Sequence, residues 1–185
     1  MTRQTIRIAT AAVFAALISV TGAPLPASAA DSGGGGSSDS SNAPVECRKG
    51  WTYDQAKKEC VRNQSLNDDQ LFQQGRLLAL AGHYDGALDT LGAIRNKKDA
   101  MVLTMIGYAT RKLGRLEEGI AIYHQALAID PDNVNTHEYL GEGYLDAGRI
   151  DLAEAQLDTL KGLCGTGCSQ YRDLARAIAG DSRWN

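Results

Sequence analysis

The sequence predicts an all-α domain made of stacked helical hairpins, and two observations support this fold class. First, residues 100–133 hold two segments, Met101–Leu113 and Leu116–Ile129, whose apolar residues recur at the spacing of an amphipathic helix. Gly114 separates them at a position suited to a left-handed turn, and Pro131 follows where a helix cannot continue. Second, the same pattern recurs before and after this stretch, so the hairpins can stack on one another.

Each of the two helical segments has a single apolar stripe, so the pair is expected to pack as a hairpin. Gly107 and Ala126 are small where the two backbones would approach, and Tyr123 is large where a gap needs filling. The stripes consist of Leu103, Ile106, Gly107 and Thr110 in the first segment and Ile120, Tyr123, Ala126 and Leu127 in the second.

The pattern repeats with a nearly constant spacing. A shift of 34 residues towards the C-terminus gives His137, Leu140–Gly141, Tyr144, Ala153, Leu157 and Leu160. A shift of 32 residues towards the N-terminus gives Leu71, Gln74–Gly75, Leu78, Gly82, Ala87, Leu91 and Ile94. The chain is therefore expected to hold three hairpins, which is near the minimum for a stack that buries a continuous core.

The pattern resembles the tetratricopeptide repeat (TPR), a helix-turn-helix unit of about 34 residues. The matching positions are Leu103, Ile106–Gly107, Thr110, Gly119, Tyr123, Ala126 and Pro131. Thr110 and Gly119 depart from the usual residues, and an unrelated helical hairpin is the alternative interpretation. The resemblance implies a right-handed α-solenoid of three TPR-like hairpins, at residues 68–99, 100–133 and 134–167, followed by a C-terminal capping helix at residues 169–180.

The N-terminus has the pattern of a secretory signal peptide at residues 1–30. Arg3 and Arg7 precede an apolar core, and small residues before Asp31 suit cleavage after Ala30 or Ala29. A retained membrane anchor is the alternative, although the apolar core is short for a membrane span. We therefore expect a periplasmic or secreted protein, in which residues 31–45 form a disordered Gly/Ser linker.

Four cysteines lie in two local pairs, and an even cysteine count in an exported chain indicates disulfides. Cys47 and Cys60 would close a small N-terminal segment at residues 46–67, worth about 3 kcal/mol in the chain-entropy model. Trp51 and Tyr53 can pack on this bridge, or form an aromatic binding patch instead.

The second pair, Cys164 and Cys168, forms a CxxxC motif between the third hairpin and the predicted capping helix. A structural disulfide is the preferred interpretation. The alternatives are a soft-metal site, for which His137 or Met105 would have to come close through the fold, and a redox-active dithiol. Pairing across the two motifs is a further alternative.

The TPR resemblance also implies a concave groove lined by the first helix of each hairpin. Ligand-facing positions would be Phe72, Arg76, Met101, Thr104, Tyr108, Arg111, Lys112, Asn135, Glu138 and Glu142. Such a groove would be basic and aromatic towards the first two repeats and acidic at the third, which suits a peptide of mixed charge. The alternative is that these charges merely solvate an inner face. Arg111 and Lys112 are expected to be exposed and of little importance for stability.

Patterns that would indicate an enzyme or a cofactor are missing from the sequence. His83, His124 and His137 lie in different repeats and form neither an HExxH motif nor a pair with a nucleophile. The chain has a net charge of −3, which argues against a nucleic-acid partner. We therefore predict a non-catalytic protein–protein interaction module without a cofactor or metal, with a copper-handling or redox accessory protein as the alternative.

Overall fold

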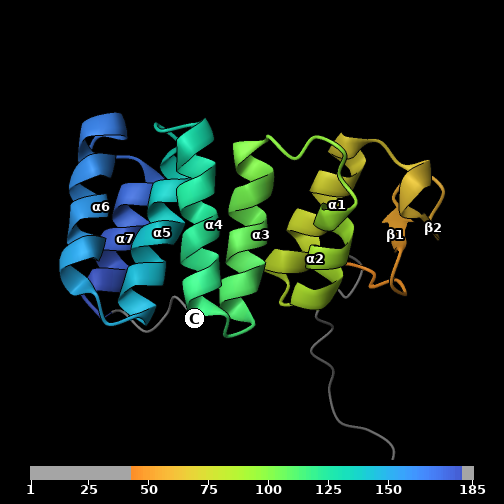
Figure 1. The fold of residues 1–185 in the computed structure, drawn as a ribbon, viewed down its shortest axis with the longest axis horizontal. Coiled ribbons are helices and arrows are strands. Elements are labelled where there is room, and N and C mark those ends of the chain that lie inside the picture. Colours follow the sequence, from red (N-terminus) through yellow and green to blue (C-terminus); the bar gives the residue numbers. More distant parts are fainter. Residues whose placement is uncertain (1–42, 181–185) are drawn as a thin grey trace, which may run out of the picture. The chain divides into compact units, whose positions relative to one another are not determined.

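The computed structural model describes residues 43–180, and Figure 1 shows their arrangement. The predicted signal peptide and most of the predicted linker lie outside the described residues. The helices are α1 (Asp68–Leu80), α2 (Tyr84–Gly92), α3 (Ala100–Lys112), α4 (Leu116–Ile129), α5 (Val134–Asp146), α6 (Ile150–Cys164) and α7 (Ser169–Ile178). None of the helices in this part of the chain is long and apolar enough to cross a membrane.

The helices form three antiparallel hairpins, α1–α2, α3–α4 and α5–α6, and each hairpin packs on the next (Figure 1). The odd-numbered helices also contact one another in sequence, α1 with α3, α3 with α5 and α5 with α7. They therefore form an inner layer, and α2, α4 and α6 form the outer one. The predicted helical-repeat solenoid is confirmed.

The same turn joins the two helices of every hairpin. Gly82, Gly114 and Gly148 each have a positive φ, between 70° and 87°, which a residue with a side chain rarely adopts. In the middle hairpin the amide of Arg115, one residue later, donates to the carbonyl of Thr110 at 3.2 Å. This bond closes the left-handed C-cap that the glycine makes possible.

Small residues set the distance between the paired helices. A Cβ atom on Gly107 of α3 would come within 2.8 Å of the Tyr123 ring on α4, and one on Gly75 within 2.5 Å of Leu91. In the third hairpin the neighbour of the corresponding glycine, Gly141, is Leu174 of α7, at 2.5 Å. At this glycine, α7 therefore packs against α5 in the way that α2 packs against α1 and α4 packs against α3.

The N-terminal segment contains a feature that the all-α fold class left out, a β-hairpin. Strands β1 (Trp51–Asp54) and β2 (Glu59–Arg62) are antiparallel, with Trp51 opposite Arg62, and a short 3₁₀ helix (Asn63–Ser65) follows. Thr52 is buried, and its hydroxyl lies 3.1 Å from the hydroxyl of Thr90 on α2. The β-hairpin thus packs against the first helical hairpin.

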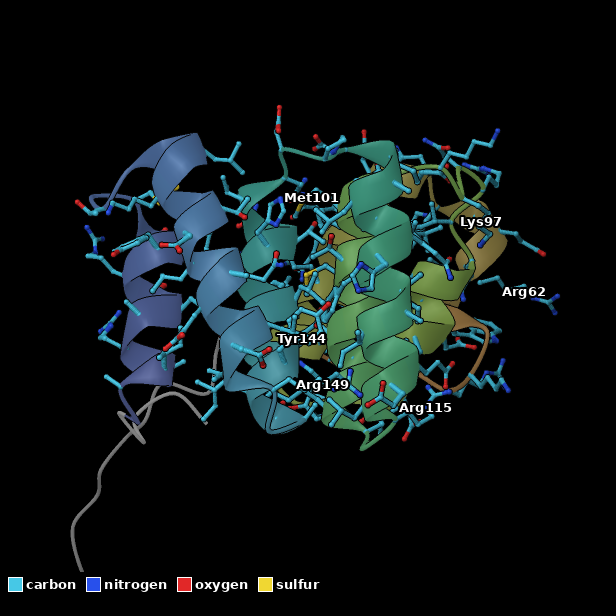
Figure 2. All side chains as sticks on the ribbon, turned by 60° about the vertical axis from the view of Figure 1, so that its left-hand side comes forward. Arg62, Lys97, Met101, Arg115, Tyr144 and Arg149 are labelled. Atoms are coloured by element: carbon cyan, nitrogen blue, oxygen red, sulfur yellow. A yellow bond between two sulfur atoms is a disulfide. The ribbon has the colours of Figure 1, made fainter. Side chains whose placement is uncertain are left out.

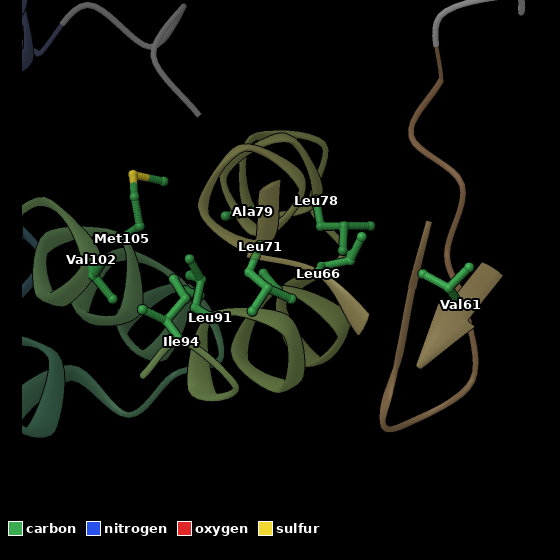
Figure 3. Packing of buried hydrophobic residues seen from close by; sticks show 11 residues of the cluster. Val61, Leu66, Leu71, Leu78, Ala79, Leu91, Ile94, Val102 and Met105 are labelled. Atoms are coloured by element: carbon green, nitrogen blue, oxygen red, sulfur yellow. The ribbon is translucent and has the colours of Figure 1, made fainter. Parts of the chain in front are cut away.

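Two apolar residues of the same segment join the core of the first repeat. Val61 and Leu66 belong to one buried cluster with Leu71 of α1, Leu91 of α2 and Met105 of α3, as the close view in Figure 3 shows. Residues 46–67 therefore cover the N-terminal end of the solenoid, in the way that α7 covers the C-terminal end. Stacked repeats need such covers because their terminal faces are apolar.

Candidate interaction groove

A pocket of about 310 Å³ opens on the inner layer of helices. It is lined by Leu80 of α1, Tyr108 and Lys112 of α3, Asn135, Glu138, Tyr139 and Glu142 of α5, and Ser169, Gln170 and Asp173 of α7. The structure thus brings together five of the predicted groove residues, Tyr108, Lys112, Asn135, Glu138 and Glu142. We call this pocket the groove pocket.

Three tyrosines form a chain of ring contacts beside the groove pocket. The Tyr108 ring centroid lies 6.2 Å from that of Tyr84 and 5.3 Å from that of Tyr139. The Nζ atom of Lys112 lies 6.0 Å from the Tyr108 ring centroid, within range of a cation–π contact. Tyr84 and Tyr139 were not among the predicted residues, since neither occupies one of the ligand-facing positions that the resemblance implies.

Arg111 differs from its prediction, because the structure buries it. Its side chain is 3% exposed, and it donates to Glu142 at 2.6 Å and to Asp146 at 2.5 Å. Both carboxylates come from α5, so the guanidinium joins the second repeat to the third. The expectation that Arg111 is exposed is therefore wrong, and its burial predicts a larger contribution to stability than an exposed charge would make.

Thr104 is also buried rather than open to the groove. Its hydroxyl donates to the carbonyl of Ala100 at 2.7 Å and lies 2.6 Å from the hydroxyl of Thr136 on α5. The sulfur of Met101 accepts from the side-chain amides of Asn133 and Asn135 at 3.5 and 3.8 Å. These groups tie the N-terminal ends of α3 and α5 together, and Thr104 cannot contact a ligand.

Glu138 is the most unusual group of the groove pocket. It is only 7% exposed, yet it lines the pocket, and among the described residues its carboxyl has neither a hydrogen bond nor an ion pair. Burial, with smaller contributions from Glu142 and Asp173, raises its pKa to about 8. Burial likewise raises the pKa of the neighbouring Tyr139 hydroxyl to about 12.

Comparison with known proteins agrees with the helical pattern. Residues 107–148 match the family model of the TPR repeat. Residues 107–148 therefore carry the TPR repeat pattern. No curated protein sequence matches the chain.

Three solved structures share the TPR fold at low sequence identity. The type III secretion translocator chaperone SycD of Yersinia enterocolitica has a TM-score of 0.53 and 17% identity, over 61% of this chain and 86% of SycD. MamA has a TM-score of 0.52 and 18% identity, over 64% of this chain and 70% of MamA. PcrH, in complex with the chaperone binding region of PopB, has a TM-score of 0.51 and 22% identity, over 61% of this chain and 92% of PcrH. At these identities the likeness concerns the fold alone.

The other two predicted groove residues, Phe72 and Arg76 of α1, also lie outside the groove pocket. Phe72 is partly buried and packs against the core cluster of the first repeat, whereas Arg76 is exposed. Arg76 nevertheless acts electrostatically on Tyr139, one of the residues that line the pocket.

Both cysteine pairs form disulfides in the structure. Cys47 is bonded to Cys60 and Cys164 to Cys168, and the Cα atoms of each pair are 5.9 Å apart. Neither residue proposed as a further metal ligand contacts the second pair, because His137 bonds Gln156 and the carbonyl of Pro131, and Met105 lies in the core cluster. Within residues 43–180, no three side chains of the metal-binding types are grouped.

The three histidines of the described residues contact separate partners. Nδ1 of His83 lies 3.0 Å from Glu46, and Nε2 of His124 lies 2.9 Å from the hydroxyl of Tyr144, which Figure 2 labels. His137 of α5 binds the loop before its own helix. Each histidine thus links neighbouring segments of the fold.

A second cavity, of about 510 Å³, lies between the N-terminal segment and α2. Trp51 and Tyr53 line it, which are the residues of the predicted aromatic patch. The guanidinium of Arg48 lies 4.0 Å from the Trp51 ring centroid, which is a cation–π contact. One face of the Trp51 ring is therefore already covered by a residue of the same chain.

Proposed function

We propose that this chain is an exported, non-catalytic interaction module that binds a peptide segment of a protein partner along its inner layer of helices. The observation that carries this proposal is the groove pocket, which is lined by charged and aromatic groups of α3, α5 and α7. Since these groups come from different repeats, a bound segment would contact several helices at once. Contacts from several helices would let the groove distinguish one peptide sequence from others.

Similar TPR structures support a peptide as the ligand class. SycD has been crystallised with a peptide of the translocator YopD, and PcrH with the chaperone binding regions of PopB and PopD. By analogy, the partner of this chain would present a short segment to the groove.

Peptide selection can test the groove. A displayed random-peptide library is selected on the unaltered protein, and the peptides obtained are measured by fluorescence anisotropy. Lys112→Glu reverses a charge in the groove pocket and should change the affinity about tenfold or more, because each 1.4 kcal/mol is a factor of ten.

The matched control is Lys161→Glu, which reverses an exposed charge on the outer helix α6. It should leave affinity within about twofold of the unaltered protein. If no peptide is enriched, or if both variants bind the selected peptides equally well, the groove assignment fails.

Export rests on the N-terminal sequence pattern and on the two disulfides, which persist in oxidising compartments. The intact mass of the protein recovered from the cell envelope, with and without alkylation, reports the cleavage site and the thiols together. We expect cleavage after Ala30 or Ala29 and no alkylated cysteine. Free thiols at Cys164 and Cys168 would favour the copper-handling or redox alternative.

A further inference from the structure

The acidic groups around Glu138 differ in their pairing. Glu142 of the same helix is bonded to Arg111, and Asp173 of α7 forms an ion pair with Arg176. Glu138 has no such partner among the described residues, although it is the most buried of the three. Buried carboxylates in folded proteins are normally paired, since desolvation of a lone charge is costly.

The other charged and titratable groups near the pocket leave this carboxyl uncompensated. Lys112 of α3 lines the same pocket, but its charge acts on Glu142, and Arg76 of α1 acts on Tyr139. The groups that act on Glu138 itself are Glu142 and Asp173, and both are acidic. Within residues 43–180, no cationic side chain offsets the charge of this carboxyl.

Aromatic rings adjoin the same space. Tyr108 and Tyr139 both line the groove pocket, and their ring centroids are 5.3 Å apart. Arg111 and Lys112 already lie 5.7 and 6.0 Å from the Tyr108 ring centroid, so a cation beside Glu138 would meet the carboxylate together with the ring of Tyr139. A carboxylate and an aromatic ring together hold a guanidinium well. The volume of about 310 Å³ lies at the lower end of the range for ligand pockets and suits one long side chain.

We propose that the groove pocket is a binding site for a single basic side chain of the partner peptide, with Glu138 as its counter-ion. This inference rests on the proposed function, because it names the ligand class of the same groove. In the free protein at neutral pH the carboxyl holds a proton, because burial and the two neighbouring acids raise its pKa to about 8. Binding of the cation ionises Glu138 and releases that proton to solvent, so affinity rises with pH up to the pKa of the free carboxyl.

The probe for this site is N-acetyl-L-arginine amide, with the uncharged isostere N-acetyl-L-citrulline amide as its control. Titration of the isotope-labelled protein is followed by NMR at about pH 8.5 and pH 6. We expect the arginine probe to shift amides around Glu138, Tyr108 and Tyr139, and to bind at least about tenfold more tightly at the higher pH. The citrulline probe should bind at least about tenfold more weakly than arginine at the higher pH.

Glu138→Gln should abolish both the arginine preference and the pH dependence. Its matched control, Glu154→Gln, changes an exposed acid on α6 and should alter neither. Equal binding of the two probes, tighter binding at low pH, or shifts confined to another surface would each overturn the proposal. The probe comparison and the pH comparison use the unaltered chain, so they decide the matter even if a variant does not fold.

The two proposals fail differently. Peptides whose affinity changes in Lys112→Glu, together with an arginine probe that does not bind, would leave the groove assignment intact and remove the basic-side-chain site. An arginine probe bound at Glu138, without any selected peptide whose binding depends on Lys112, would support the basic-side-chain site and contradict the groove assignment.

Discussion

Replacement of Arg111 by Ala should destabilise the protein by about 3 kcal/mol. The guanidinium is 3% exposed, and its partner Glu142 has a side chain that is 15% exposed, so their contact is a buried ion pair. Removal of one member of such a pair typically costs about 3–5 kcal/mol, because the other charge stays buried and unpaired. The contact with Asp146 adds little, since that side chain is 48% exposed and its charge is screened by water.

The lower free energy of unfolding can be measured by urea denaturation, detected by circular dichroism, as a shift of the midpoint to lower urea concentration. In thermal unfolding it corresponds to about 10 °C for a domain of this size. Arg149→Ala is the matched control, because Arg149 also bridges the second and third repeats, to Glu117 at 2.6 Å, but with both side chains well exposed. Figure 2 shows Arg149 near the turn at one end of the helices. The control should cost about 1 kcal/mol or less.

A second change separates the lost ion pair from lost packing. If the unpaired charge of Glu142 causes the destabilisation, Glu142→Gln should restore part of the stability in the Arg111→Ala background, whereas it should be harmful in the unaltered protein. An Arg111→Ala variant that unfolds together with Arg149→Ala, within about 1 kcal/mol, would refute the reasoning.

Two further predictions concern stability. Gly107→Ala should lower the urea midpoint, because the new methyl group meets the Tyr123 ring at 2.8 Å and overpacking costs about 1–3 kcal/mol. Gly162 has open space around it, so Gly162→Ala should raise the free energy of unfolding by up to about 1 kcal/mol. The opposite order would mean that the helices of the second hairpin can separate freely. Glu138→Gln should unfold at a higher temperature than the unaltered protein above about pH 8 and at a similar one below about pH 4.5. The reason is that a folded-state pKa of about 8 stabilises the fold at low pH, and this contribution is lost as the pH rises through that value. A difference in melting temperature that does not change with pH would contradict it.

The solenoid could be predicted from the sequence because its signals are local and repeated. Apolar spacing within single helices and a glycine such as Gly114 at each turn are visible without any knowledge of the partners across the fold. The β-hairpin was missed since its strands, Trp51–Asp54 and Glu59–Arg62, are only four residues long and are held by a disulfide and by contacts with α2. Such short strands carry little periodicity.

The groove pocket could be predicted only in part. Tyr108 and Lys112 lie where the family resemblance implies, since their place depends on helical spacing alone. The burial of Arg111 depends instead on carboxylates 31 and 35 residues further along the chain, which meet it only once two repeats have stacked. The contribution of α7 to the pocket is likewise a property of the packed structure rather than of a repeated motif.

Residues 46–67 and α7 cover the two ends of the helical stack. Val61 and Leu66 complete the core at the N-terminal end, and Leu174 packs against Gly141 at the C-terminal end. In the described part of the chain, both ends of the stack are therefore covered by residues of the chain itself. Duplication of an inner hairpin would lengthen the groove while both covers stayed in place.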